Sequence, residues 1–135
     1  MHITLAFLGE LMPSQLRAVE ACCQPLPDSF VLTLDRIGFW HKSGIVWAGT
    51  RAPDPGFIKF TEALRHKLRR TGFQIDRRMF VPHLTLLRKV HKRPRILLPA
   101  MEWSIEEYQL ANSDLSLRGS CYSILKRWSI KGDVK

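Results

Sequence analysis

The tetrapeptide His-x-Thr-Leu occurs twice in the chain, at residues 2–5 and 83–86, and both copies lie in hydrophobic runs typical of β-strands. Successive side chains of a strand point to opposite faces, so the His and the Thr of each copy share one face. The apolar residues between and after them point to the other face. Two such strands laid side by side would bring two imidazoles and two hydroxyls onto one surface.

These groups suit the cleavage of a phosphodiester without a metal. One group must take a proton from the attacking oxygen, and a second must give a proton to the leaving oxygen. Imidazole titrates near neutral pH, so His2 and His83 can hold opposite protonation states at the same time. Thr4 and Thr85 can donate hydrogen bonds to the non-bridging phosphate oxygens. Either motif alone is better read as a polar position on a half-exposed strand, and the duplication reverses that reading.

On these motifs the sequence resembles the 2H phosphoesterases, a family named for two His-x-Thr/Ser-x motifs. Within the family it is most similar to the bacterial RNA 2′,3′-cyclic phosphodiesterases, long called 2′-5′ RNA ligases. The stretches that carry the resemblance follow one another in order along nearly the whole chain, at residues 2–11, 32–40, 45–53, 80–89 and 122–130.

The resemblance implies a bilobal α+β fold, with antiparallel sheets around a central cleft and helices on the outside. It also implies hydrolysis of RNA 2′,3′-cyclic phosphate ends to 2′-phosphomonoesters, with His2 as proton donor and His83 as proton acceptor. No metal or other cofactor is expected, and the same site can join RNA ends through a 2′-5′ linkage. Two alternatives stay open: another 2H activity, on a small cyclic nucleotide or 2′-5′ oligonucleotide, and a catalytically impaired, truncated RNA-binding relative.

One departure from the family pattern concerns the start of the chain. Members of the family have a further strand and helix, about forty residues, before the first motif, whereas here His2 follows Met1. We therefore expect a single domain over residues 1–135 that lacks this N-terminal region, as a fragment, a misassigned start or a natural truncation. Chain ends fray unless they are held, so this form is expected to be less active than a longer one.

Composition agrees with a small, single domain, because 135 residues can bury one core. A formal net charge of +9 favours a polyanionic partner such as RNA. The three cysteines show neither a disulfide framework nor metal-ligand spacing. No apolar run approaches the length of a membrane span. No obligate protein partner is evident in the sequence. A reduced, cytoplasmic protein is expected.

The pattern of apolar residues and turn formers predicts about six strands and two helices, an α+β arrangement. The predicted helices are residues 13–23 and 57–70, and Gly72 is expected to cap the second. Within that helix, Arg65 is assigned to the charged face. The predicted strands cover residues 2–8, 30–39, 45–50, 82–88, 103–117 and 121–130, with residues 118–120 as the last turn.

Two further residues are candidates for substrate binding. Arg88 can bind a phosphate oxygen or the nucleotide, but strict strand alternation puts its side chain opposite that of His83. A role at the site therefore requires a bulge or a strand end there. Tyr122 can stack on a base, and packing in the core is an equal alternative. Trp40 and Trp47 could also stack on a base, but burial in the core is the better interpretation for both.

A basic loop follows the second motif, at residues 89–99. Its charge can guide RNA into the site, or it can be a solvated surface. His41 and His66 have no chemical partner visible in the sequence and are read as surface residues.

Overall fold

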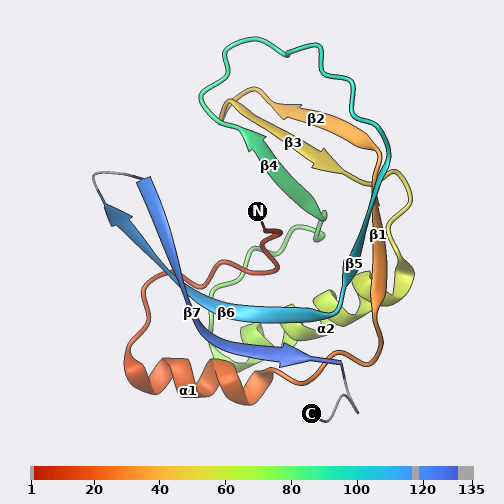
Figure 1. Ribbon diagram of the computed structural model, residues 1–135. Coiled ribbons are helices and arrows are strands. Elements are labelled where there is room, and N and C mark those ends of the chain that lie inside the picture. Colours follow the sequence, from red (N-terminus) through yellow and green to blue (C-terminus); the bar gives the residue numbers. More distant parts are fainter. Residues whose placement is uncertain (1, 117–118, 131–135) are drawn as a thin grey trace.

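The computed structural model describes residues 2–116 and 119–130, and for residues 114–116 and 119–121 it describes the backbone alone. This part of the chain forms two helices and seven strands in three antiparallel sheets (Figure 1). The strand order is β2-β3-β4 in the largest sheet, and β1 pairs with β5 and β6 with β7 in two-stranded sheets. The α+β class predicted from the sequence is confirmed.

Both helices have identifiable ends. Helix α1 (Pro13–Cys22) begins after Met12, whose N–H donates to the Gln15 side chain. Helix α2 (Pro55–Thr71) begins after Asp54, whose carboxylate accepts from the N–H groups of residues 56 and 57. Gly72 ends it in the left-handed region, at φ 112°, as predicted.

Each of the segments predicted as one strand, residues 30–39 and 103–117, forms two strands in the structure. Strands β1 (Phe30–Leu34) and β2 (Arg36–Trp40) belong to different sheets and are separated by Asp35. Strands β5 (Met101–Ile105) and β6 (Glu107–Ser116) are separated in the same way. The sequence prediction ran each strand through two consecutive charged residues, 35–36 and 106–107, and these mark the places where the chain changes sheet. The remaining strands are β3 (Ile45–Gly49), β4 (His83–Leu87) and β7 (Gly119–Ser129), and the predicted last turn lies partly outside the described residues.

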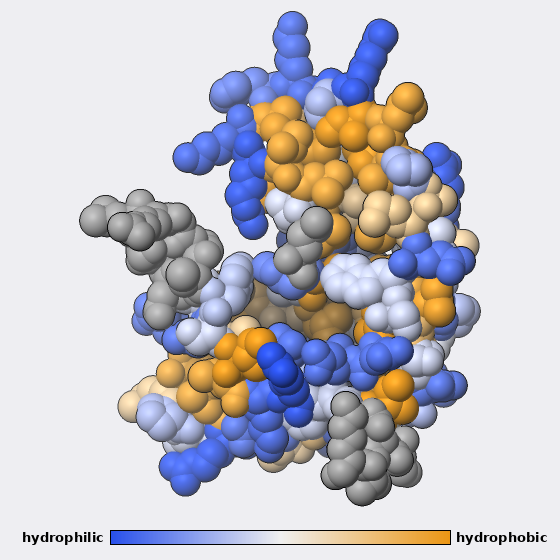
Figure 2. Space-filling model, viewed as in Figure 1, coloured by the Kyte–Doolittle hydropathy of each residue, from blue (hydrophilic) through white to orange (hydrophobic). Residues whose placement is uncertain are grey.

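Two hydrophobic clusters hold the fold together. The larger one joins α1 and α2 to β1, β6 and β7, and the smaller one lies between β1 and the β2-β3-β4 sheet. Ile3 and Ile105 pack against both clusters. Each cluster belongs to one lobe, and Figure 2 shows the surface hollowed between the two lobes. The segment that contains the first motif therefore lies where the lobes meet (Figure 1).

The predicted strand at residues 2–8 is wrong except at one residue. Only Ile3 forms a β-bridge, and the chain bends at Leu5. The carbonyl oxygen of Leu5 accepts from the Arg65 guanidinium at 2.8 Å, so it is engaged by a side chain and not by a strand ladder. The predicted alternation is broken at the bend, because Leu5 and Ala6 both pack against the core and Phe7, expected on the face of Ile3, is 80% exposed.

Candidate active site

The second motif lies on β4 as the sequence predicts. His83 pairs with Gly49 of β3 and Thr85 pairs with Trp47, so these side chains share one face of the sheet. Leu84, between them, is buried in the smaller cluster on the other face. His83 and Thr85 are both half-buried. The motif therefore presents its polar groups on the face away from the smaller cluster, and Leu84 anchors it on the other face.

The first motif meets the second through the antiparallel bridge between Ile3 and Leu84. In this register His2 lies across from Thr85, and Thr4 lies across from His83. Ile3 and Leu84 both pack against the smaller cluster, so the four polar side chains emerge from the opposite side. The structure thus brings together the two motifs that the sequence singles out, and it does so without a full first strand.

The imidazole of His83 is held by its surroundings. Its Nδ1 lies 2.9 Å from the carbonyl oxygen of Val81, which can only accept, so Nδ1 donates and the neutral ring carries its lone pair on Nε2. The Trp40 ring packs edge-on against it with ring centroids 4.8 Å apart. The hydrogen bond and the packing fix both the tautomer and the orientation of the ring. Nε2 is left as the nitrogen that can take a proton.

Trp47 forms the floor beside His83. A Cβ atom at Gly38 would come within 2.0 Å of the Trp47 ring, and a Cβ at Gly49 within 2.6 Å, so the indole lies directly on the backbone at both glycines. Trp47 is 7% exposed, as the sequence reading expected, whereas Trp40 is 39% exposed and that reading is wrong. Glycines within a strand often mark such a close approach and were the available sequence signal for this floor.

Tyr122 reaches the site from the other lobe. Its ring, on β7, meets that of His2 edge-on, with centroids 4.7 Å apart. The Tyr122 side chain is 53% exposed, so the core-packing alternative does not hold. The two histidines thus have separate aromatic neighbours, Tyr122 for His2 and Trp40 for His83.

Arg88 follows the end of β4 and is exposed. Residues 46 and 47 of β3 pair with residues 87 and 85 of β4, so Leu86 is an extra residue in a β-bulge. Leu86 packs against the smaller cluster, and Leu87 pairs with the buried Val46. The bulge shifts the alternation by one position, so a side chain that continued the strand at Arg88 would share the face of His83.

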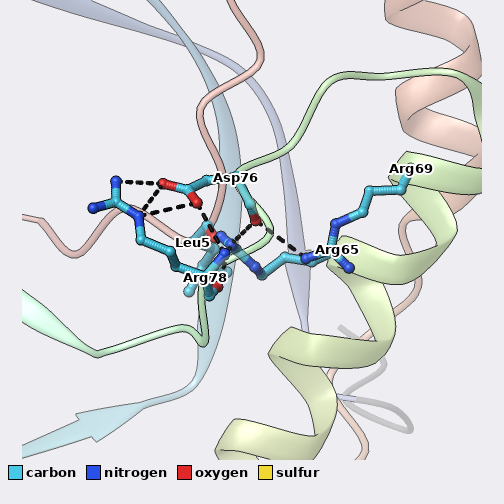
Figure 3. A network of polar contacts seen from close by, with 5 residues as sticks. All are labelled: Leu5, Arg65, Arg69, Asp76 and Arg78. Carbon is cyan, nitrogen blue, oxygen red and sulfur yellow. Dashed lines mark hydrogen bonds and ion pairs between the residues drawn. The ribbon is translucent and has the colours of Figure 1, made fainter.

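A buried arginine, Arg65, joins the segments that carry the two motifs (Figure 3). Its guanidinium donates to the carbonyl oxygens of Leu5, Asp76 and Arg78, and only 6% of the residue is exposed. The sequence assigned Arg65 to the charged face of the helix, and that assignment is wrong. Helical spacing gave no signal for its role, because the carbonyls it binds come from loops.

The bend near Asp76 has its own ion pair. The Arg78 guanidinium donates to both Asp76 carboxylate oxygens, and these hydrogen bonds lower the pKa of Asp76 to about 2. The segment that leads to the second motif is thereby held from within, as well as by Arg65.

Neither a metal cluster nor a membrane-spanning helix is present in the described part of the chain. No three His, Cys, Asp or Glu side chains lie together there as metal ligands would. No helix in residues 2–116 and 119–130 is long and apolar enough to cross a membrane.

The fold and the two facing His-x-Thr motifs are those of a two-histidine phosphoesterase. Residues 1–126 match the family model of the 2′-5′ RNA ligase superfamily, and the chain belongs to this family. An Escherichia coli K12 protein named RNA 2′,3′-cyclic phosphodiesterase is 36% identical over 133 residues, which are 96% of this chain and 76% of the relative. A Thermus thermophilus protein of the same name is 30% identical, over 98% of this chain and 73% of its own.

Solved structures give the same result. E. coli LigT in complex with 3′-AMP superposes with a TM-score of 0.80 at 33% identity, over 96% of this chain and 76% of LigT. A structure described as a phosphoesterase gives a TM-score of 0.82 at 34% identity, with the same coverage of both chains.

Proposed function

We propose that this protein hydrolyses RNA 2′,3′-cyclic phosphate ends to 2′-phosphomonoesters. The observation that carries the proposal is the bridge between Ile3 and Leu84, which sets the two His-x-Thr motifs side by side. The activity named for its relatives in E. coli and T. thermophilus supports it. The reaction requires an acid, a base and donors for the phosphate oxygens, and the site supplies all three.

In the proposed reaction, Nε2 of His83 takes a proton from a water molecule as the water oxygen attacks phosphorus. The bond from phosphorus to the 3′ oxygen breaks, and protonated His2 gives its proton to that oxygen. The products are a 2′-phosphate and a free 3′ hydroxyl, and proton exchange with solvent restores both histidines. The hydrogen bond from Nδ1 of His83 to Val81 keeps the accepting nitrogen turned away from the backbone.

The remaining groups act on the phosphate and its nucleotide. The hydroxyls of Thr4 and Thr85 donate to the non-bridging oxygens, whose negative charge grows in the transition state. Arg88, on the same face by the bulge in β4, adds a guanidinium for one of these oxygens. Tyr122, exposed beside His2, offers its ring to the terminal nucleoside.

The same arrangement supports ligation, in which a different nucleophile opens the cyclic phosphate. If the 5′ hydroxyl of a second RNA replaces water, His83 takes its proton and the 3′ oxygen again leaves, which produces a 2′-5′ phosphodiester. Water is far more concentrated than RNA ends, so hydrolysis is the expected net direction.

The test is the turnover of an RNA oligonucleotide that ends in a 2′,3′-cyclic phosphate. His2→Ala and His83→Ala should each lower kcat by about 10²–10⁴-fold, the range for general acid–base groups. His66→Ala is the matched control, because His66 is an exposed histidine on α2 and should retain wild-type turnover. Circular dichroism checks that each variant is folded. Near-wild-type kcat in either folded motif variant would refute the assignment.

A further inference from the structure

A strongly basic surface lies at the end of β4, beyond the site. Residues 88–95 include five Lys and Arg side chains, and no Asp or Glu occurs between Asp76 and Glu102. All five of these cations are exposed. None of the ion pairs found among the described residues involves them, so their charge is uncompensated by neighbouring carboxylates.

The first part of this loop is fixed to the sheet that carries His83. The N–H of Val90 donates to the carbonyl oxygen of Gly44 at 2.9 Å, and Lys89 has a left-handed backbone, with φ 57°. Gly44 closes the turn between β2 and β3, which also carries the exposed Lys42. The contact therefore places Lys42 and Lys89 at the same end of the β2-β3-β4 sheet.

The second part of the loop goes to the reverse face of this sheet. Arg93 and Arg95 line a hollow of about 690 Å³ together with Ile37. Ile37 pairs with Ala48 and packs against the smaller cluster, on the face away from His83. The loop is thus divided: residues 93–97 line the hollow on the reverse face, whereas residues 89–92 precede it, next to the contact between Val90 and Gly44.

The distance from His83 to the basic loop suits an RNA substrate longer than one nucleotide. Lys89 lies six positions beyond His83 along the chain, which is about 20 Å at the usual rise per residue of a strand. A cyclic mononucleotide bound at the histidines would not reach that far. The nucleotides that precede the cyclic end in an RNA chain would, each with its own phosphate.

We propose that Lys42, Lys89 and Lys92, here called the basic rim, bind the backbone phosphates of the RNA nucleotides that precede the cyclic end. This proposal rests on the proposed function and narrows its substrate to RNA chains of several nucleotides. Lysine ammonium groups contact phosphates as point charges and read no base, so the rim confers affinity without sequence preference.

The test is a triple variant, Lys42→Gln, Lys89→Gln and Lys92→Gln. Glutamine retains most of the side-chain length and, at residue 89, adopts the left-handed backbone with the same strain as lysine. Each phosphate contact on a single strand contributes about 0.7 to the slope of log affinity against log salt. Between 50 and 200 mM salt, the wild-type KM for a ten-nucleotide substrate should therefore rise about 20-fold more than the KM of the variant.

The triple variant should leave kcat unchanged, and its kcat/KM for 2′,3′-cyclic AMP should stay within twofold of wild type. The matched control removes three exposed charges from α2 by Lys59→Gln, Lys67→Gln and Arg70→Gln, with the same change in net charge. It should bind the oligonucleotide with nearly the wild-type salt slope. An equal effect of the control, or an equal loss on oligonucleotide and mononucleotide, would overturn the proposal.

Direct binding separates this proposal from the proposed function. Fluorescence anisotropy of a labelled ten-nucleotide RNA that ends in a 2′-phosphate requires no turnover. If the wild type binds it and the triple variant loses the salt slope, the basic rim stands even for a protein that hydrolyses no cyclic end. If both bind alike, the rim is not an RNA site, whatever the catalytic activity.

Discussion

Replacing Arg65 with Met should damage both stability and turnover. Among the residues the structure describes, only the Arg65 side chain donates hydrogen bonds to both motif segments. It binds the backbone at the end of the first motif and the backbone that leads to the second. Methionine preserves the aliphatic stem but removes the guanidinium, whose central carbon lies 5.8 Å from the centroid of the Phe80 ring. The carbonyl oxygens of Leu5 and Arg78 then lose this donor, while that of Asp76 keeps a hydrogen bond from Arg69 at 3.2 Å.

The expected size follows from these two lost hydrogen bonds. A hydrogen bond to a charged group contributes about 1.5–3 kcal/mol, so the loss lies near 3 kcal/mol after relief of the cost of burying the charge. For a chain of this length that is roughly a 10 °C fall in the thermal midpoint. A displacement of about 1 Å between the motifs lowers catalysis by about 100-fold, so kcat should fall at temperatures where the variant is still fully folded.

The assay is calorimetry together with kcat and KM for a cyclic-ended RNA, and the controls are Arg69→Met and Arg65→Lys. Arg69 donates only to a carbonyl that Arg65 also binds, so Arg69→Met should retain wild-type kcat. Lysine retains the charge but lacks the fork that reaches two segments, so Arg65→Lys should recover stability more than kcat. Wild-type kcat in folded Arg65→Met, or equal losses in Arg69→Met, would refute the reasoning.

Four other outcomes are expected. Gly38→Ala should cost about 1–3 kcal/mol, measured by urea unfolding, because its Cβ would lie 2.0 Å from the Trp47 ring. The hydrogen bonds from Arg78 lower the pKa of Asp76 to about 2, so its stabilising contribution is complete above the ordinary pKa of an aspartate and is lost as pH falls toward 2. In Asp76→Asn, the free energy of unfolding should therefore fall less between pH 4 and pH 2 than in the wild type. Burial raises the pKa of Cys23 to about 11, so stability is lost as pH rises from 9 to 11, and Cys23→Ala should reduce that loss. Turnover should persist in excess EDTA and yield a 2′-phosphate by phosphorus NMR; strict dependence on a divalent ion or a 3′-phosphate product would contradict the mechanism.

The sequence predicted the meeting of the two motifs because strand alternation is a local rule. His83 and Thr85 share a face for that reason, and the bridge at Ile3 extends the rule to the first motif. The exposed positions of His41 and His66 were also predicted correctly. The roles of the individual site residues stay predictions, and the His2 and His83 variants test two of them.

The parts that could not be predicted depend on contacts between distant segments. The first strand is absent because the carbonyl of Leu5 is bound by a helix side chain sixty residues away in the sequence. The break at Asp35 arises because its N–H donates to the carbonyl oxygen of Gly49 and its carboxylate accepts from the backbone N–H of Arg51. The predicted role of Arg88 depends on a bulge at Leu86, which only the pairing with β3 defines. None of these partners is visible in a window of neighbouring residues.

The bridge between Ile3 and Leu84 also sets the order of events during synthesis. The first motif leaves the ribosome early, but its partner strand follows about eighty residues later. At about 5–20 residues per second, the nascent first motif waits roughly 4–16 seconds for its partner. Through that interval Ile3 and Leu5 cannot enter the clusters they occupy in the finished fold. The two motifs can therefore meet only after β4 has left the ribosome.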